Sequence, residues 1–208
     1  VLETFKSFEP SAYSGFGIRC VLINTQSITP TDSERRQEKM AALAALAITH
    51  EVIIMTETWL KPISDTSQLR AVLAGFELFR HDRRNRRGGG VAIAVKRTVS
   101  ASRFRFSREA SLPWEVIGLT LTKGGKRAKL LAVYRPPSSS ISRASLEVSD
   151  DLIMSAYEEF VDHHPELPVV WVGDFNLDGV YFEQGEARLR AASGRPSSIM
   201  EAFVAVRE

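Results

Sequence analysis

Three polar residues each close an apolar run of the sequence, and their side chains suit contact with a metal ion or a phosphate group. Asn24 follows Cys-Val-Leu-Ile, Glu57 follows Val-Ile-Ile-Met-Thr, and Asp174 follows Val-Val-Trp-Val-Gly. Such runs predict buried strands, and open α/β sheets place their sites at strand ends. Mg²⁺ takes oxygen ligands, so the three residues together indicate metal-assisted chemistry on a phosphate. Each alone has a simpler explanation, because Asn and Asp are common turn residues.

A basic segment offers a second chemical feature. Residues 80–87 hold five arginines and are followed by three glycines. Residues 61–130 hold 16 Lys/Arg against 5 Asp/Glu, although the whole chain carries only +2. Guanidinium groups bind phosphate in a two-pronged geometry, so we expect an exposed basic loop over 80–90 that contacts a polyanion. The alternative is an ordinary solvated hairpin.

Alternating strands and helices would position these residues. The runs 19–24 and 51–56 predict buried strands. The segment between them begins with a capping-box pattern at 31–34 and predicts a helix through 47, so the two strands form a parallel βαβ unit. The runs 76–80, 90–95, 114–121 and 129–134 predict antiparallel strands, with a hairpin turn at 123–126. A helix over 145–163, a strand over 168–172, and a tail of helix and loop from 187 complete a mixed α/β sandwich.

Length and composition fit one globular domain. The chain has 208 residues, of which 44% are hydrophobic and 25% are charged. It contains no apolar run of 18 residues, and its first residues lack a signal-peptide pattern, so we expect no membrane span. A single cysteine, Cys20, fits a reducing, intracellular compartment.

Five motifs in order give the chain a specific resemblance. They are Leu-Ile-Asn-Thr-Gln-Ser-Ile at 22–28, Thr-Glu-Thr-Trp-Leu at 56–60, the Arg-Arg-Gly-Gly-Gly-Val segment within 83–95, Tyr-Arg-Pro-Pro at 134–137, and Gly-Asp-Phe-Asn at 173–176. The set covers about residues 18–180 and resembles the endonuclease domain of non-LTR (LINE-type) retrotransposons, in the DNase I-like exonuclease–endonuclease–phosphatase superfamily. One departure is Gln26, which stands where many relatives have Arg.

The resemblance implies a fold, a cofactor and roles for individual residues. The fold would be a DNase I-like four-layer α/β sandwich, with two mixed β-sheets flanked by helices. Glu57 and Asn24 would hold Mg²⁺ (or Mn²⁺), Asp174 would position the attacking water, and Asn176 and Tyr134 would bind phosphate oxygens. DNA would be contacted by Arg83, Arg84, Arg86, Arg87 and Arg135. A full-length parent would carry a reverse transcriptase and act in the nucleus.

Simpler explanations exist for several of these residues. Glu57 could cap the turn that follows it, Asn176 could form an Asx-turn, and Tyr134 could be a core residue with a hydrated hydroxyl.

One element of the family pattern does not occur. Superfamily members finish with a Ser-Asp-His motif, and none of the four histidines here has that context. The resemblance therefore implies a domain that is incomplete at its C-terminus and nearly inactive as a nuclease. Two alternatives stay open: a non-catalytic remnant that binds nucleic acid, and a phosphatase or phosphodiesterase of the same superfamily, against which the motifs at 56–60 and 134–137 argue.

Overall fold

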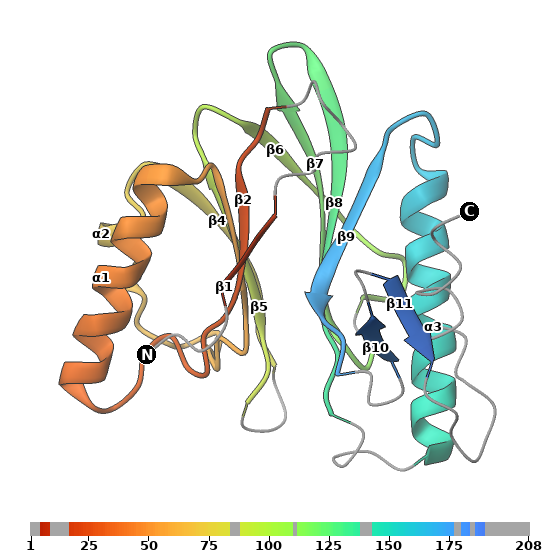
Figure 1. Ribbon diagram of the computed structural model, residues 1–208, viewed down its shortest axis with the longest axis horizontal. Helices are drawn as coiled ribbons and strands as arrows, with labels where there is room; N and C mark the ends of the chain where they lie inside the picture. Colours follow the sequence, from red (N-terminus) through yellow and green to blue (C-terminus); the bar gives the residue numbers. More distant parts are fainter. Residues whose placement is uncertain are drawn as a thin grey trace.

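A computed structural model describes residues 5–8, 17–83, 88–109, 112–137, 143–176, 180–183 and 186–189. Two β-sheets form its centre (Figure 1). The first sheet has five strands in the order β1-β2-β3-β5-β4. Strands β2 and β3 pair in parallel and the other pairs are antiparallel. The bounds are β1 Phe5–Phe8, β2 Cys20–Asn24, β3 Val52–Thr56, β4 Phe76–His81 and β5 Val91–Lys96.

The second sheet has four strands in the order β6-β7-β8-β9. Strands β7 and β8 form a hairpin through Gly124 and Gly125, whose positive φ angles of 57° and 78° suit glycine. Strands β8 and β9 pair in parallel. The bounds are β6 Ser100–Phe104, β7 Glu115–Lys123, β8 Lys126–Tyr134 and β9 Val169–Asp174, and a separate hairpin joins β10 Val180–Glu183 to β11 Glu186–Leu189.

Helices of the described segments cover the outer faces of the sheets (Figure 1). Helices α1 (Ser33–Thr49) and α2 (Ser67–Val72) lie against the first sheet, and α3 (Arg143–Asp162) lies against the second. Alternate strand residues face opposite sides, so each sheet fills two cores. The core between the sheets includes Ile54, Ile93, Leu119 and Ala132. The two outer cores pack α1 and α2 against the first sheet and α3 against the second, so the DNase I-like four-layer sandwich is confirmed. In the described part of the chain, no helix combines the length and apolar character needed to cross a membrane.

Most of the predicted elements are confirmed, including the parallel βαβ unit and the hairpin at 123–126. The N-cap of α1 lies one residue later than the Thr31 of the predicted capping box. Asp32 is the N-cap, and it accepts a hydrogen bond from Arg35 N at 2.9 Å. The sequence did not predict β1, β6, β10 or α2. Strands β1 and β6 lie at sheet edges, β10 has four residues and α2 has six, so none carries a long apolar pattern. The prediction of helix and loop from 187 was wrong at its start, because 187–189 belong to β11.

Candidate active site

The polar residues at the strand ends lie on the same faces of the strands as the core residues between the sheets. Along β2, β8 and β9, alternate apolar residues face that core, and Asn24, Tyr134 and Asp174 occupy the same alternate positions at the carboxyl ends. Apolar packing gives way to polar contact there. The site therefore forms at one end of the sandwich, where both sheets contribute.

An amide joins the two acidic residues of this site. Asn24 Nδ2 donates to Glu57 Oε1 at 3.2 Å and to Asp174 Oδ2 at 3.0 Å. The Tyr134 hydroxyl donates to the same Glu57 oxygen at 3.3 Å. The residues are separated by up to 150 positions in the chain, yet they form one hydrogen-bonded cluster. The structure thus brings together four of the side chains that the sequence indicated.

The backbone around Glu57 is held in an unusual conformation. Glu57 and Trp59 have positive φ angles of 50° and 55°, which non-glycine residues seldom adopt. Neighbouring loops hold this turn, since Ser27 N donates to Glu57 O at 2.9 Å and Trp59 N donates to Gly89 O at 2.9 Å. Strain of this kind persists only where surrounding contacts enforce it, and it clusters at functional sites.

Asn176 lies beside the cluster and faces the backbone. Its Nδ2 donates to Arg135 O at 2.7 Å, and Arg135 Nη1 donates to Asn176 O at 3.1 Å. Arg135 N also donates to Asp174 O at 2.8 Å. The end of β8 and the Gly-Asp-Phe-Asn turn are therefore joined by reciprocal hydrogen bonds, which fix where Asp174 points.

Two of the five arginines predicted to contact DNA, Arg83 and Arg135, pair with carboxylates inside the protein. Arg135 is buried, and its other two nitrogens donate to Asp150 at 3.0 and 3.2 Å, so it supports the fold beside the site. Arg83 is also largely buried and pairs with Glu115. The prediction of an exposed loop is wrong for its described residues, because 80–83 and 88 are half-buried and 89–90 are buried. Arg84, Arg86 and Arg87 lie outside the described residues.

Residues 21–199 match the family model for the Endonuclease/Exonuclease/phosphatase family. The chain belongs to this family. No curated protein matches it by sequence.

Solved structures show the same fold at low identity. Humanized TDP2 of D. rerio is 15% identical with a TM-score of 0.53, over 76% of this chain and 62% of that chain. The catalytic domain of human Nocturnin with bound sulfate is 14% identical with a TM-score of 0.53, over 83% and 67%. The 3′ phosphatase NExo from Neisseria, bound to a product DNA hairpin, is 15% identical with a TM-score of 0.53, over 78% and 59%. The chain thus spans less than two thirds of the length of the first of these, and the likeness establishes the fold alone.

The endonuclease/exonuclease/phosphatase family implies a divalent metal ion, and the residues at the site fit one. Mg²⁺ is usually held by one or two carboxylates plus waters and substrate phosphate, and Glu57 and Asp174 supply two carboxylates. Among the described residues, no group of three or more His, Cys, Asp or Glu is placed to hold a metal. Asn24 Oδ1 accepts from Gln26 N at 3.1 Å, so contact between that oxygen and a metal stays a prediction.

The surroundings of Tyr134 favour the protonated form of its phenol. Burial raises the pKa of its phenol well above the ordinary value, and the charges of Glu57 and Asp174 raise that pKa further, while Arg83 lowers it. The phenol is therefore protonated at physiological pH. Its hydroxyl donates the hydrogen bond to Glu57 Oε1.

Sequence reasoning missed Glu115, the partner of Arg83. The available signal was a carboxylate inside the apolar run Trp-Glu-Val-Ile, where a charge needs a partner. The four histidines lie outside the carboxylate cluster. His50 is the C-cap of α1, His163 and His164 follow α3, and His81 Nδ1 contacts Val116 O at 2.9 Å.

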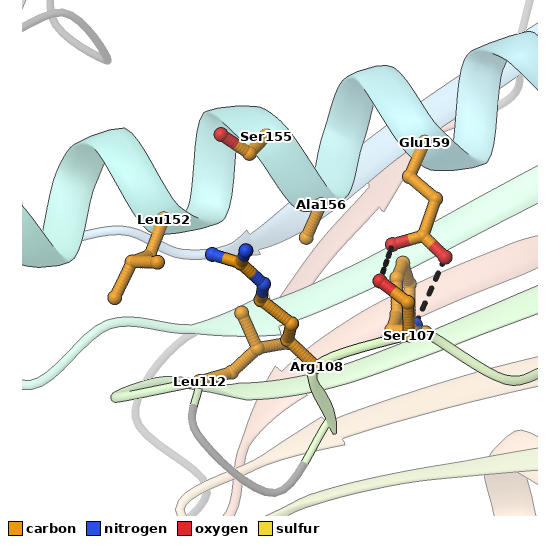
Figure 2. Close-up of a pocket in the computed structure, with 8 residues that line it drawn as sticks. Ser107, Arg108, Leu112, Leu152, Ser155, Ala156 and Glu159 are labelled. Atoms are coloured by element: carbon orange, nitrogen blue, oxygen red, sulfur yellow. Dashed lines mark hydrogen bonds between the residues drawn. The ribbon is translucent and has the colours of Figure 1, made fainter.

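A separate surface pocket of about 350 Å³ lies between α3 and the segment after β6 (Figure 2). Within it, Ser107 N and Oγ donate to Glu159 at 2.9 and 3.0 Å. None of the site residues predicted from the sequence is among its described lining residues. The pocket therefore contributes nothing to the proposed chemistry.

Proposed function

We propose that the chain is a Mg²⁺- or Mn²⁺-dependent endonuclease domain that hydrolyses a phosphodiester bond of DNA. We further propose that it is of the type that accompanies a reverse transcriptase in non-LTR retrotransposons and acts on nuclear DNA. The observation that supports this most directly is the Asn24 amide held between the Glu57 and Asp174 carboxylates. The retrotransposon type rests on the five ordered motifs, which include Tyr-Arg-Pro-Pro and Thr-Glu-Thr-Trp-Leu.

Each residue of the cluster has a role that its contacts support. Glu57 holds the metal, which when bound polarises the phosphate and stabilises the leaving oxygen. Asp174 orients the attacking water and accepts its proton, while Asn24 keeps the two carboxylates apart and in register. The Tyr134 hydroxyl, which donates to Glu57 in this structure, turns its single O–H to a phosphate oxygen when the substrate is bound. The amide of Asn176 has two N–H groups, so one can donate to Arg135 O while the other donates to phosphate.

Contact with DNA is assigned to the basic segment. Arg84, Arg86 and Arg87 keep the role that the sequence predicted. Arg83 and Arg135 act within the protein instead, because a buried arginine paired with a carboxylate is poorly placed to bind phosphate.

A metal-binding measurement with a nicking assay tests the proposal. We expect Mn²⁺ to bind the chain in calorimetry and the affinity to fall at least about tenfold in Glu57→Ala, because one of two carboxylate ligands is lost. The wild-type chain should nick supercoiled plasmid in the presence of Mg²⁺, and Glu57→Ala should not. Protein is used in excess over plasmid, so that slow nicking is also detected. Glu38→Gln, on an exposed position of α1, is the matched control.

Other outcomes identify the competing functions. Hydrolysis of a small phosphomonoester, with plasmid left intact, would point to a phosphatase. Binding of DNA without hydrolysis of either substrate would point to a non-catalytic remnant. Equal Mn²⁺ affinity in wild type and Glu57→Ala would remove the assigned metal site.

A further inference from the structure

A carboxylate stands where the core between the sheets requires an apolar side chain. Glu115 begins β7 and shares a face with Ile117 and Leu119, both fully buried between the sheets. Its cross-strand partner in the register is Tyr134. The Glu115 side chain is only 7% exposed, so its charge is stable there only with a partner.

The partner comes from the other sheet. Arg83 follows β4, and its Nε and Nη2 donate to the two Glu115 oxygens at 2.6 and 2.8 Å. This two-pronged geometry is the strong form of an arginine–carboxylate contact. The same guanidinium lies over the Tyr134 ring, with Cζ 5.4 Å from the ring centroid. Glu115 therefore fixes a positive charge directly beside the tyrosine of the site.

The backbone at Gly89 passes close to the Arg83 guanidinium. A Cβ added at Gly89 would lie 2.4 Å from Arg83 Cζ, so only glycine lets the chain pass this close to the guanidinium. Gly89 O in turn accepts from Trp59 N, two residues beyond Glu57. The ion pair is thus connected to the metal-binding turn through packing as well as through Tyr134.

We infer that Glu115 is a positioning residue, which holds Arg83 on the Tyr134 ring and keeps its charge away from the Glu57 and Asp174 carboxylates. The inference rests on the proposed function. The guanidinium lies over the ring whose hydroxyl contacts Glu57, so without Glu115 the nearest unpaired carboxylate charge would be at the site. Pairing of Arg83 with that charge would compete with a metal ion for the same oxygens and would disturb the Asn24 amide between the two carboxylates.

Two measurements on the full chain test the inference, one with metal and one without. In Glu115→Gln we expect Mn²⁺ affinity to fall at least about tenfold, because a full positive charge reaches the ligand oxygens. In the metal-free chain, the NMR resonances of the Asn24 side-chain amide, assigned by their loss in Asn24→Ala, should shift in Glu115→Gln. In Glu115→Gln combined with Arg83→Gln, both properties should return toward wild type, since the competing charge is gone.

Matched variants separate positioning from folding. Glu109→Gln removes the carboxylate from another Arg–Glu pair of 2.6 Å, between Arg103 and Glu109, and should change neither measurement. Where Glu115→Gln fails to fold, Glu115→Asp, which retains the charge on a shorter arm, should show a smaller change in the same direction. If Glu115 only stabilises the fold, Glu115→Gln would lower the melting temperature. The double variant would then restore neither the Mn²⁺ affinity nor the Asn24 amide resonances.

The outcomes distinguish a failure of the inference from a failure of the proposed function. Mn²⁺ affinity that is lost in Glu57→Ala but unchanged in Glu115→Gln would overturn the inference and leave the function standing. A wild-type chain that binds no Mn²⁺ would overturn the function, while the Asn24 amide resonances would still decide the inference. Failure of the double variant to restore those resonances would overturn it as well.

Discussion

At the scale of residues, the site depends on side chains whose protonation state and hydrogen-bonding direction are fixed by their surroundings. Tyr134 illustrates this, because burial and two nearby carboxylates keep its phenol protonated and aimed at Glu57 Oε1. Asn24 can donate to two acceptors at once, which lets it hold Glu57 and Asp174 in a fixed relation. Neither property depends on a neighbouring residue in the sequence.

Tyr134→Phe tests the donor role. We expect the rate of plasmid nicking to fall by roughly 10²-fold, the typical effect of removing one donor from a developing negative charge. Stability should change by about 1 kcal/mol or less, because the ring stays in place and only a single hydrogen bond is lost. Single-turnover nicking and urea denaturation measure the two effects. An unchanged rate would make Tyr134 a core residue whose hydroxyl has no part in the reaction.

At the scale of elements, the site needs two parallel strand pairs that end at the same level. Strands β2 and β3 deliver Asn24 and Glu57, and strands β8 and β9 deliver Tyr134 and Asp174. The second pair is very close at its end, where a Cβ at Gly173 would lie 2.0 Å from Val133 O. Glycine at this position lets β9 approach β8 and brings Asp174 into line with Tyr134.

Gly173→Ala should therefore disrupt the end of this strand pair. We expect a loss of about 3 kcal/mol or more in the free energy of unfolding, because the added methyl meets backbone that cannot move aside cheaply. Gly75→Ala is the control, since a Cβ there meets nothing within 4 Å, and it should change stability by about 0.5 kcal/mol at most. Urea denaturation followed by tryptophan fluorescence measures both. Equal free energies of unfolding for Gly173→Ala and the wild-type chain would show that β9 can shift without cost.

At the scale of the whole molecule, polar contacts join the two sheets at both ends of the sandwich. The pair of Arg83 and Glu115 lies at the end that carries the site. At the opposite end, Lys123 Nζ lies 2.7 Å from a Glu51 oxygen and donates to Gly17 O at 2.7 Å. Partial burial opposes the charged form of Glu51, but the hydrogen bonds and charges of Lys123 and Arg19 outweigh it and lower the Glu51 pKa below its ordinary value.

This lowered pKa predicts a pH dependence of stability. A carboxyl whose pKa is depressed by folding stabilises the folded chain above its unfolded pKa, and that contribution disappears as the pH falls through the folded value. Glu51→Gln should therefore cost about 0.5–1 kcal/mol at pH 7, a modest amount because the pair is partly exposed, and almost nothing at pH 3. Urea denaturation at both pH values measures it, with Glu38→Gln as the control. A cost that is equal at the two pH values would contradict the prediction.

The sequence by itself determined the strands with strong apolar runs and the polar residues that end them. A buried strand must be apolar along its length, and a polar side chain can follow only where the core ends, so Asn24, Glu57 and Asp174 were visible as candidates.

The tertiary structure alone decided how the strands divide between two sheets and which charges meet. β5 and β7 have similar apolar runs, yet β5 pairs in the first sheet and β7 in the second. The resemblance implied DNA contacts for Arg83 and Arg135, but the guanidinium fork matches a carboxylate as well as a phosphate in the same two-pronged geometry. Their carboxylate partners, Glu115 and Asp150, lie 32 and 15 residues away. Contacts across such separations depend on how the sheets and α3 pack, and no local pattern in the sequence encodes that packing.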